Sequence, residues 1–349
     1  IAKKTPEGIN RIFYTICGST AVETAIKIAI AYHRAKGDSK RFRFVGRERG
    51  YHGMNIGATT VGGMINNVKT FASVLMPGVQ HMRHTHLPEH KFVKGQPETG
   101  VELAEDLERI AMNFGGENIA ACIVEPIAGS TGTLVPPKGY LKRLRQICDK
   151  HGILLIFDEV ITGWGRTGSA FAAQEWGVTP DIMTMAKATT NGVVPMGIVA
   201  VKEEMYDAVL DSSKAPEGTP ELFHGYTYSG IPVAVAAALA VQDIFDKEDI
   251  FNKAKEMSPY FQDGLHSLKD LKDVVSIRGY GMMGGIEMKM NEKPGKAGFQ
   301  TFKHCYDSGV NFKNTGDTLI IAPQFICEKK HIDEIIDKLR TGISNYTKS

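Results

Sequence analysis

Residues 153–157 form a short apolar run, Ile-Leu-Leu-Ile-Phe, that ends directly at the acidic residue Asp158. The run is too short for a buried helix and glycines flank it, so it predicts a strand buried on both faces of a parallel sheet. A second short apolar run, residues 182–186, ends at Lys187. In open α/β sheets, ligands bind beyond the carboxyl ends of such strands. We therefore expect an acid and a lysine at one edge of the sheet, placed to hold a planar ligand between them.

Strand-like and helix-like segments alternate from the start of the chain to about residue 245, which predicts a mostly parallel, doubly wound sheet. A helix is predicted from Thr20 to Lys36, with Thr20 and Glu23 forming a capping box at its start. The helix expected over 141–150 leads into the strand that ends at Asp158. Further strands are expected at 11–16, 42–45, 119–124 and 197–201, and a long apolar helix at 231–245.

Beyond about residue 250 the sequence changes to charged helices that flank short strands. The helices are expected at 251–271 and 330–346, and the strands at 274–277, 285–288 and 318–321. This arrangement predicts a second α+β unit. We therefore expect a large α/β domain over 1–245 and a small C-terminal α+β domain over 246–349.

Composition narrows the possible partners. The 41 basic and 39 acidic residues nearly balance, and no apolar stretch is long enough to span a membrane, so neither nucleic acid nor a membrane is an expected partner. The five cysteines are odd in number and lack metal-ligand spacing, which is typical of a reducing compartment, and we expect the cytoplasm. The chain starts at Ile1 without an apolar signal segment, and we expect it to begin partway into a longer protein.

Two other patterns suggest ligands but lack the context that those ligands need. No carboxylate completes a metal-ligand set around the histidines, so no metal site is predicted. Gly279-Tyr-Gly-Met-Met-Gly284 matches the dinucleotide-binding fingerprint, but a strand follows it instead of a helix. We interpret it as a glycine-rich turn. The histidines concerned are His52, His81, His84, His86 and His90.

Three local patterns fit a phosphorylated planar cofactor when they are taken together. Gly18-Ser19-Thr20 could bind a phosphate through free backbone N–H groups, although alone it more commonly marks a helix cap without a ligand. Tyr51 could stack on a ring, although alone it more commonly marks a buried loop corner. Lys187 and Asp158 are each ordinary alone. Together they supply what pyridoxal phosphate needs, an amine for the Schiff base and an acid facing the pyridinium nitrogen.

Over nearly its whole length the chain resembles class III pyridoxal-phosphate-dependent aminotransferases of fold type I. The resemblance is strongest to the subgroup that acts on ω-amino acids and amines with pyruvate. It implies a mostly parallel sheet of the seven-stranded type with helices on both faces. The matching strings are Gly18-Ser-Thr-Ala-Val-Glu-Thr-Ala, Arg47-Glu-Arg-Gly-Tyr-His-Gly, Ile123-Val-Glu-Pro-Ile-Ala-Gly-Ser-Thr-Gly, Pro136-Pro-Lys-Gly-Tyr-Leu, Ile156-Phe-Asp-Glu-Val-Ile-Thr-Gly, Ala186-Lys, Asn191-Gly, Pro195-Met-Gly and Phe223-His-Gly-Tyr-Thr-Tyr-Ser-Gly.

The resemblance implies a role for each matching residue. Lys187 would form the Schiff base with pyridoxal phosphate and then move the substrate proton, while Asp158 would pair with the pyridine nitrogen. Thr227 would reach the phosphate of the partner subunit, because sites in this family are shared across a homodimer or a dimer of dimers. The other implied cofactor-binding residues are Gly18, Ser19, Thr20, Tyr51, His52, Glu125 and Val160.

Three features depart from the family pattern. The N-terminal segment that covers the substrate entrance in relatives is absent from the sequence. The phosphate turn reads Cys17-Gly-Ser-Thr20 where relatives have Ser-Gly-Ser-Glu. Lys313 stands where relatives have an arginine that binds the substrate carboxylate, and a lysine cannot form the same bidentate fork. We therefore expect an altered substrate preference, for example for a sulfonate or a simple amine.

The activity implied by the resemblance is ping-pong transamination. An amino group would move from an ω-amino acid or amine, such as β-alanine or taurine, to pyruvate, giving alanine and an aldehyde or semialdehyde. The alternatives are an aminomutase or a decarboxylating transaminase of the same family, or a catalytically silent pyridoxal-phosphate-binding protein. The Gly279 fingerprint offers a nicotinamide oxidoreductase as a further alternative.

Overall fold

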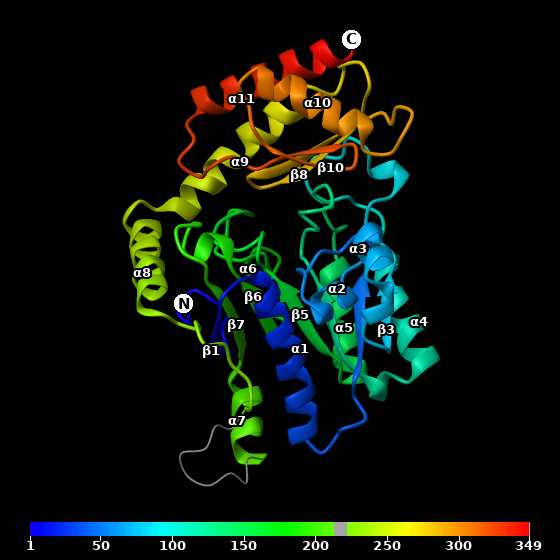
Figure 1. The fold of residues 1–349 in the computed structure, drawn as a ribbon, viewed down its shortest axis with the longest axis vertical. Coiled ribbons are helices and arrows are strands. Elements are labelled where there is room, and N and C mark those ends of the chain that lie inside the picture. Colours follow the sequence, from blue (N-terminus) through cyan, green and yellow to red (C-terminus); the bar gives the residue numbers. More distant parts are fainter. Residues whose placement is uncertain (213–221, 349) are drawn as a thin grey trace.

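The computed structural model describes residues 1–212 and 222–348 of the chain. Two sheets organise the molecule (Figure 1). A seven-stranded sheet, called here the large sheet, is built from strands within residues 9–202, and a four-stranded sheet, the small sheet, from strands within residues 274–321. Among the described residues, no helix is long and apolar enough to cross a membrane.

The large sheet has the strand order β1-β7-β6-β5-β4-β2-β3. All pairs from β3 to β6 are parallel, whereas β7 pairs antiparallel with both β6 and β1. The predicted mostly parallel sheet is confirmed, with β7 as the strand that runs in the opposite direction. The strands are β1 (Ile9–Thr15), β2 (Arg43–Arg47), β3 (Val79–Met82), β4 (Ile119–Val124), β5 (Leu154–Asp158), β6 (Ile182–Met185) and β7 (Gly197–Lys202).

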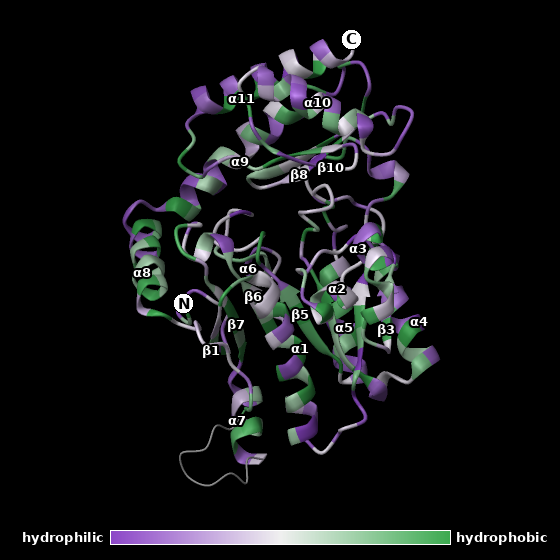
Figure 2. Ribbon diagram, viewed as in Figure 1, coloured by the Kyte–Doolittle hydropathy of each residue, from purple (hydrophilic) through white to green (hydrophobic). Residues whose placement is uncertain are grey.

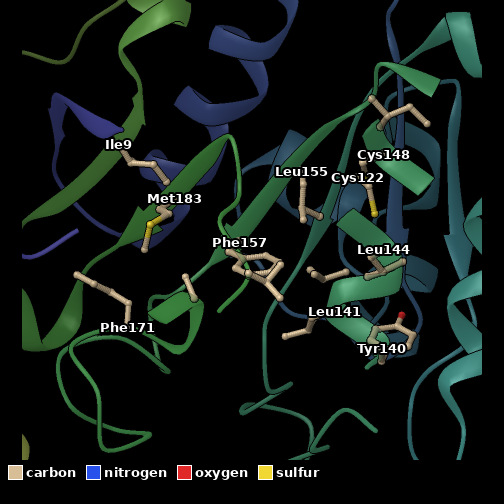
Figure 3. Close-up of a cluster of buried hydrophobic side chains, with 14 of the residues drawn as sticks. Ile9, Cys122, Tyr140, Leu141, Leu144, Cys148, Leu155, Phe157, Phe171 and Met183 are labelled. Carbon is tan, nitrogen blue, oxygen red and sulfur yellow. The ribbon is translucent and has the colours of Figure 1, made fainter. Parts of the chain in front are cut away.

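Helices cover both faces of the large sheet because its central strands are apolar on both faces. On β5, Leu155 and Phe157 point into one core and Leu154 and Ile156 into the other, as the alternation of side chains along a strand requires. Figure 3 shows the first core, in which side chains of β5 and α5 are buried together. The helices of this part are α1 (Gly18–Ala35), α2 (Ile56–Val61), α3 (Ile65–Thr70), α4 (Glu105–Phe114), α5 (Tyr140–His151), α6 (Ala172–Glu175), α7 (Glu203–Ser212) and α8 (Pro232–Lys247).

The predicted capping box of Thr20 and Glu23 is wrong. Helix α1 begins at Gly18 with Cys17 as its N-cap, so Thr20 lies inside the first turn. The Thr20 hydroxyl turns back and accepts hydrogen bonds from the backbone N–H groups of Ile16 and Cys17, at 3.2 and 3.0 Å. Thr20 therefore closes the turn that precedes the helix instead of capping a later start.

The small sheet has the order β10-β11-β9-β8 and is antiparallel throughout. Three helices pack on it and share its core, and Figure 2 shows α10 and α11 as mixtures of hydrophilic and hydrophobic residues, as expected for helices with one buried face. The elements are α9 (Ile250–His266), β8 (Val274–Tyr280), β9 (Met283–Met288), α10 (Lys296–Asp307), β10 (Lys313–Thr315), β11 (Thr318–Ile321) and α11 (Lys329–Tyr346).

The Gly279–Gly284 motif forms the tight hairpin between β8 and β9. Gly281 has a φ of +57° at the turn, and Gly284 pairs with Gly279 across the hairpin. The interpretation of this motif as a glycine-rich turn is confirmed, since no helix N-terminus follows it to receive a pyrophosphate.

Candidate active site

The carboxyl ends of β4, β5 and β6 open into a cavity of about 320 Å³. Because these strands are parallel, residues that follow them meet at one edge of the sheet. The cavity brings together most of the predicted site residues from segments that are far apart in the sequence. Those that line it are Gly18, Ser19, Tyr51, His52, Glu125, Asp158, Val160 and Lys187.

Asp158 is a buried carboxylate that three segments of the chain hold in place. The backbone N–H of Val160 and the hydroxyl of Thr184 on β6 both donate to its Oδ1, each at 3.1 Å. Nδ1 of His52 lies 2.8 Å from Oδ2, and since an ionised carboxylate only accepts, this ring nitrogen is the donor. A buried charge without such partners would be strongly destabilising. The three donors therefore fix the orientation of the acid.

Lys187 follows β6 in a strained backbone conformation. Its φ is +44°, a left-handed value that a side chain with a Cβ rarely adopts and that is often found at functional sites. Burial by the surrounding protein lowers the pKa of its amine, Asp158 and Glu125 oppose this effect, and Lys313 adds to it. The side chain is still accessible from the open cavity. The amine is thus shifted toward its neutral, nucleophilic form.

Two glycines shape the turn that leads into α1. A Cβ on Gly53, whose φ is +116°, would lie 2.4 Å from Oγ of Ser19, and a Cβ on Gly18 would lie 3.2 Å from the methyl groups of Val160. The backbone N–H of Met54 donates to the Ser19 hydroxyl at 3.1 Å. Free N–H groups at the start of an 18-residue helix favour an anion. The turn is therefore a narrow cradle of the kind that a phosphate occupies.

Cys17 also lines this cradle. Burial alone would raise the pKa of its thiol, but hydrogen bonds from Thr20 and Ser19 lower it. The donors that surround Cys17 therefore favour negative charge at this end of the cavity, as they would favour a phosphate.

Glu125 organises the loop that carries Tyr51. Its Oε1 accepts from the backbone N–H of Tyr51 at 2.9 Å and its Oε2 from that of Gly129 at 3.1 Å. Burial raises the pKa of this carboxyl, His52 opposes the rise and Asp158 adds to it. Glu125 therefore positions Tyr51 along the cavity wall. Its carboxyl group also lines the cavity, where it is a polar neighbour for a bound ligand.

Three predicted site residues lie outside this cavity. Thr20 hydrogen-bonds to the backbone behind the cradle, and Thr227 lies exposed in the turn before α8. Lys313 on β10 lines a second cavity of about 510 Å³, which shares Val160 and Lys187 with the first. The structure therefore places Lys313 beside the candidate cofactor site, on the side formed by the small sheet.

Sequence reasoning missed two residues of the site. Gly53 lines the cavity, and Thr184 is a direct partner of Asp158. Thr184 could have been found from strand pairing, because it lies directly opposite Asp158 in the β5–β6 register.

The histidine-rich loop makes contacts to the backbone. Nε2 of His81 lies 2.8 Å from the carbonyl oxygen of Gly62, and Nε2 of His90 lies 3.0 Å from that of Thr99. Among residues 1–212 and 222–348, no group of three or more His, Cys, Asp or Glu side chains is arranged to hold a metal ion.

Comparisons with known proteins place the chain in a family. Residues 1–343 match the aminotransferase class-III family. A Caulobacter vibrioides protein named omega-aminotransferase is 51% identical over 342 residues, which cover 97% of this chain and 77% of that protein. A Pseudomonas aeruginosa beta-alanine–pyruvate aminotransferase is 43% identical over 346 residues, covering 99% of this chain and 77% of that protein.

The solved structures agree with the sequence relatives. The omega transaminase from Pseudomonas jessenii in complex with PMP superposes with a TM-score of 0.93 at 29% identity, covering 99% of this chain and 78% of that one. The chain belongs to the class III aminotransferases. It is a pyridoxal-phosphate-dependent enzyme that takes an amino donor and a keto acid.

The residues of the cavity fit this cofactor. The cavity combines a narrow anion cradle with the buried acid Asp158 and with Lys187, an amine of lowered pKa. Extra Cβ atoms at Gly18 and Gly53 would reduce the space between them. When bound, pyridoxal phosphate supplies an aldehyde that carries the amino group and a ring that accepts electrons.

The charge of Lys313 gives a prediction for Lys187. The Lys313→Gln substitution removes a positive neighbour that lowers the pKa of Lys187. The pKa of Lys187 should therefore rise, and its neutral amine should appear only at higher pH. The measurement is the pH midpoint of Lys187 dinitrophenylation in the cofactor-free protein, followed by peptide mass spectrometry. Lys142→Gln, at an exposed position of α5, is the control. A midpoint that stays unchanged or falls in Lys313→Gln would contradict the electrostatic coupling.

Proposed function

We propose that the protein transfers the amino group of an ω-amino acid or related amine to pyruvate, giving alanine and an aldehyde or semialdehyde. The observation that carries this proposal is the single cavity that collects the phosphate cradle, Asp158 and Lys187. The named activities of the Caulobacter and Pseudomonas relatives support ω-amino donors and pyruvate as the substrates.

Each cavity residue has a binding task in this proposal. Ser19 and the backbone N–H groups of the cradle would bind the phosphate, with Thr20 supporting the turn from behind. Tyr51 and Val160 would pack against the cofactor ring. Their positions depend on Glu125, which holds the backbone of Tyr51, and on Asp158, which accepts from the backbone of Val160.

Two residues would control the protons. Asp158 would hold a proton at the pyridine nitrogen, because its carboxylate is fixed at the cavity by contacts with His52, Val160 and Thr184. Lys187 Nζ would take the proton from the carbon that bears the substrate amino group, since burial lowers its pKa and so increases the share of neutral amine that can act as a general base. Because β6 positions Lys187 at the cavity, its amine is already close to the substrate, which lowers the entropic cost of orienting it for proton transfer.

The substrate would enter through the second cavity. It lies between the small sheet and the loops that follow β4, β5 and β6 of the large sheet, and residues of both parts line it. This supports the division of the chain into a large domain over 1–245 and a small domain over 246–349. Lys313 would face the acidic end of a substrate from the small domain as a single positive charge, without the fork of an arginine.

The active protein is proposed to be a homodimer. Large apolar side chains next to the cavity segments are exposed, including Met54 at 48% and Val193 at 75%, and Phe223 before α8 is exposed at 85%. Exposed apolar side chains mark an interaction surface where they form a contiguous patch, and these residues are proposed to contribute to one. Burial in a dimer would also bring the exposed Thr227 toward the partner's cradle. The cytoplasm is the proposed compartment, because all five cysteines are free thiols.

A donor screen tests the proposed reaction. The wild-type protein with pyridoxal phosphate should form alanine from pyruvate with β-alanine or another ω-amino donor, one alanine for each aldehyde product. Lys187→Ala should fold and bind the cofactor without forming product, because no amine remains to move the proton. Lys142→Gln is the matched surface control.

The screen also separates the alternatives. An isomerised amino acid without alanine would indicate an aminomutase, and release of CO₂ a decarboxylating transaminase. Cofactor absorbance that no donor changes would indicate a silent cofactor-binding protein. Transamination retained in Lys187→Ala would overturn the assignment of the base.

A mixing experiment tests the shared site. Thr227→Glu should weaken phosphate binding across the interface by charge repulsion, and Lys187→Ala should remove the base. Each homodimer is then inactive at low cofactor concentration, but co-expressed chains form mixed dimers with one intact site. Random pairing predicts about a quarter of wild-type activity. Activity no higher than the mean of the two homodimers would show that Thr227 does not serve the partner's site.

A further inference from the structure

Trp164 joins the loop after β5 to the turn that carries Lys187. It lies in the loop between β5 and α6, and its indole Nε1 donates to the hydroxyl oxygen of Thr189 at 3.0 Å. Both side chains are buried, with 1% of Trp164 and none of Thr189 exposed. The hydrogen bond is therefore a direct side-chain link between the segment that follows Asp158 and the segment that contains Lys187.

The indole of Trp164 is fixed by aromatic packing. Its ring centre lies 5.0 Å from that of Phe171 and 6.1 Å from that of Phe245 on α8, on which it stacks at an angle of 23°. The backbone N–H of Trp164 donates to the carbonyl oxygen of Ala170 at 2.6 Å, and its φ is +59°. A left-handed φ at a bulky residue is strained and persists only where the surrounding structure holds it. The indole N–H is therefore presented to Thr189 from one fixed position.

The hydrogen bond from Trp164 determines the orientation of the Thr189 hydroxyl. An indole N–H only donates, so the hydroxyl oxygen accepts from it and the hydroxyl hydrogen needs another acceptor. That acceptor is the carbonyl oxygen of Ala186, which lies 3.0 Å from Oγ1 of Thr189 and 3.0 Å from its backbone N. Ala186 directly precedes Lys187, so two hydrogen bonds from Thr189 hold the peptide group that joins these residues.

This peptide group sets the backbone conformation of Lys187. The φ of Lys187 measures rotation about the bond from the peptide nitrogen to its Cα, and it has the strained value of +44°. The next peptide group is held less closely, since the N–H groups of Thr190 and Gly192 lie 3.3 Å from the carbonyl oxygen of Lys187. The bonds to Ala186 are therefore the tighter restraint on the direction in which the Lys187 side chain leaves the turn.

We propose that Trp164 is a positioning residue for Lys187. Through the Thr189 hydroxyl, it holds the Ala186–Lys187 peptide in the conformation that places the lysine amine in the cofactor cavity. Trp164 itself is not among the residues that line either cavity, so its effect on the reaction passes through the protein. The inference rests on the proposed function and deepens it, because Lys187 is the base in that proposal.

A simpler role is that Thr189 only satisfies a buried donor. A buried N–H needs an acceptor wherever it lies, and this role makes no demand on Lys187. It predicts that Trp164→Phe leaves Lys187 unchanged, because the substitution removes the N–H together with its need for an acceptor. The proposal predicts instead that the Thr189 hydroxyl becomes free to rotate and that the turn loosens.

The first test measures Lys187 in the cofactor-free protein. Burial lowers the pKa of its amine, so a looser turn that lets the amine reach water should raise that pKa. In Trp164→Phe, the pH midpoint of Lys187 dinitrophenylation, read by peptide mass spectrometry, should rise by about half a unit or more. Trp176→Phe is the matched control, since it changes the other of the two tryptophans, which packs against Tyr280. An unchanged midpoint in Trp164→Phe, or an equal rise in the control, would overturn the proposal.

Variants of Thr189 test whether the effect passes through its hydroxyl. Thr189→Val removes the hydroxyl and should raise the midpoint at least as much, whereas Thr189→Ser keeps it and should stay near the wild type. Adding Trp164→Phe to Thr189→Val should produce no further rise, because both changes break the same link. Additive rises, or a Thr189→Ser midpoint as high as that of Thr189→Val, would contradict the proposed link.

A second variant covers the case in which circular dichroism shows that Trp164→Phe is unfolded. Trp164→Met places an adaptable apolar side chain there without an N–H, and the same rise in the midpoint is expected. An unchanged midpoint would again overturn the proposal.

The half-reaction separates positioning from substrate binding. In the Trp164→Phe holoenzyme, the maximal single-turnover rate of amino transfer from β-alanine should fall roughly tenfold, because a small displacement of the base slows proton transfer. The donor concentration that gives half of this rate should stay within about twofold. An unchanged rate, or a loss of apparent affinity alone, would contradict a positioning role. If the wild-type holoenzyme transaminates no donor, the proposed function fails, while the dinitrophenylation midpoint still tests Trp164.

Discussion

The hydrogen bonds to the Asp158 carboxylate tie the large sheet to the chemistry of the site. Thr184 donates from the neighbouring strand, Val160 from the loop that follows, and His52 from the loop after β2. Each donor is placed by a different part of the fold, so all three hydrogen bonds form only when β6 and the loops after β2 and β5 are in place. Lys187 follows the same strand as Thr184, so the register that positions one residue also positions the other. The distance between acid and amine is thus set by strand pairing.

The charge that the lining residues favour alternates in sign along the two cavities. At the α1 end, N–H and hydroxyl donors favour an anion and lower the pKa of the Cys17 thiol. At the small-sheet end, Arg166 and Lys313 favour an anion again. Between them lie Asp158 and Glu125, the acids that act on Lys187. This order matches a ligand set with a phosphate at one end, a carboxylate at the other and an amine in the middle.

The parts of the fold that depend on local patterns could be predicted from the sequence. The β4 strand was expected at 119–124 and lies there, because a short run of apolar residues buried on both faces has few alternatives. The helix start at Gly18 was misplaced, because its N-cap is a cysteine whose turn Thr20 closes from inside. The contacts of Asp158 with His52 and Thr184 join residues 106 and 26 positions away, and no local pattern encodes them.

The most direct test of this account is the effect of Asp158→Asn on the half-reaction with the best amino donor. The variant keeps the shape of the side chain but removes the charge that would hold a proton at the pyridine nitrogen. The account predicts that cofactor still binds while the single-turnover rate of amino transfer falls by at least about a hundredfold. Asp149→Asn, an exposed aspartate on α5, should leave the rate unchanged. A wild-type rate in Asp158→Asn would show that this buried acid does not act on the cofactor, and would contradict the account.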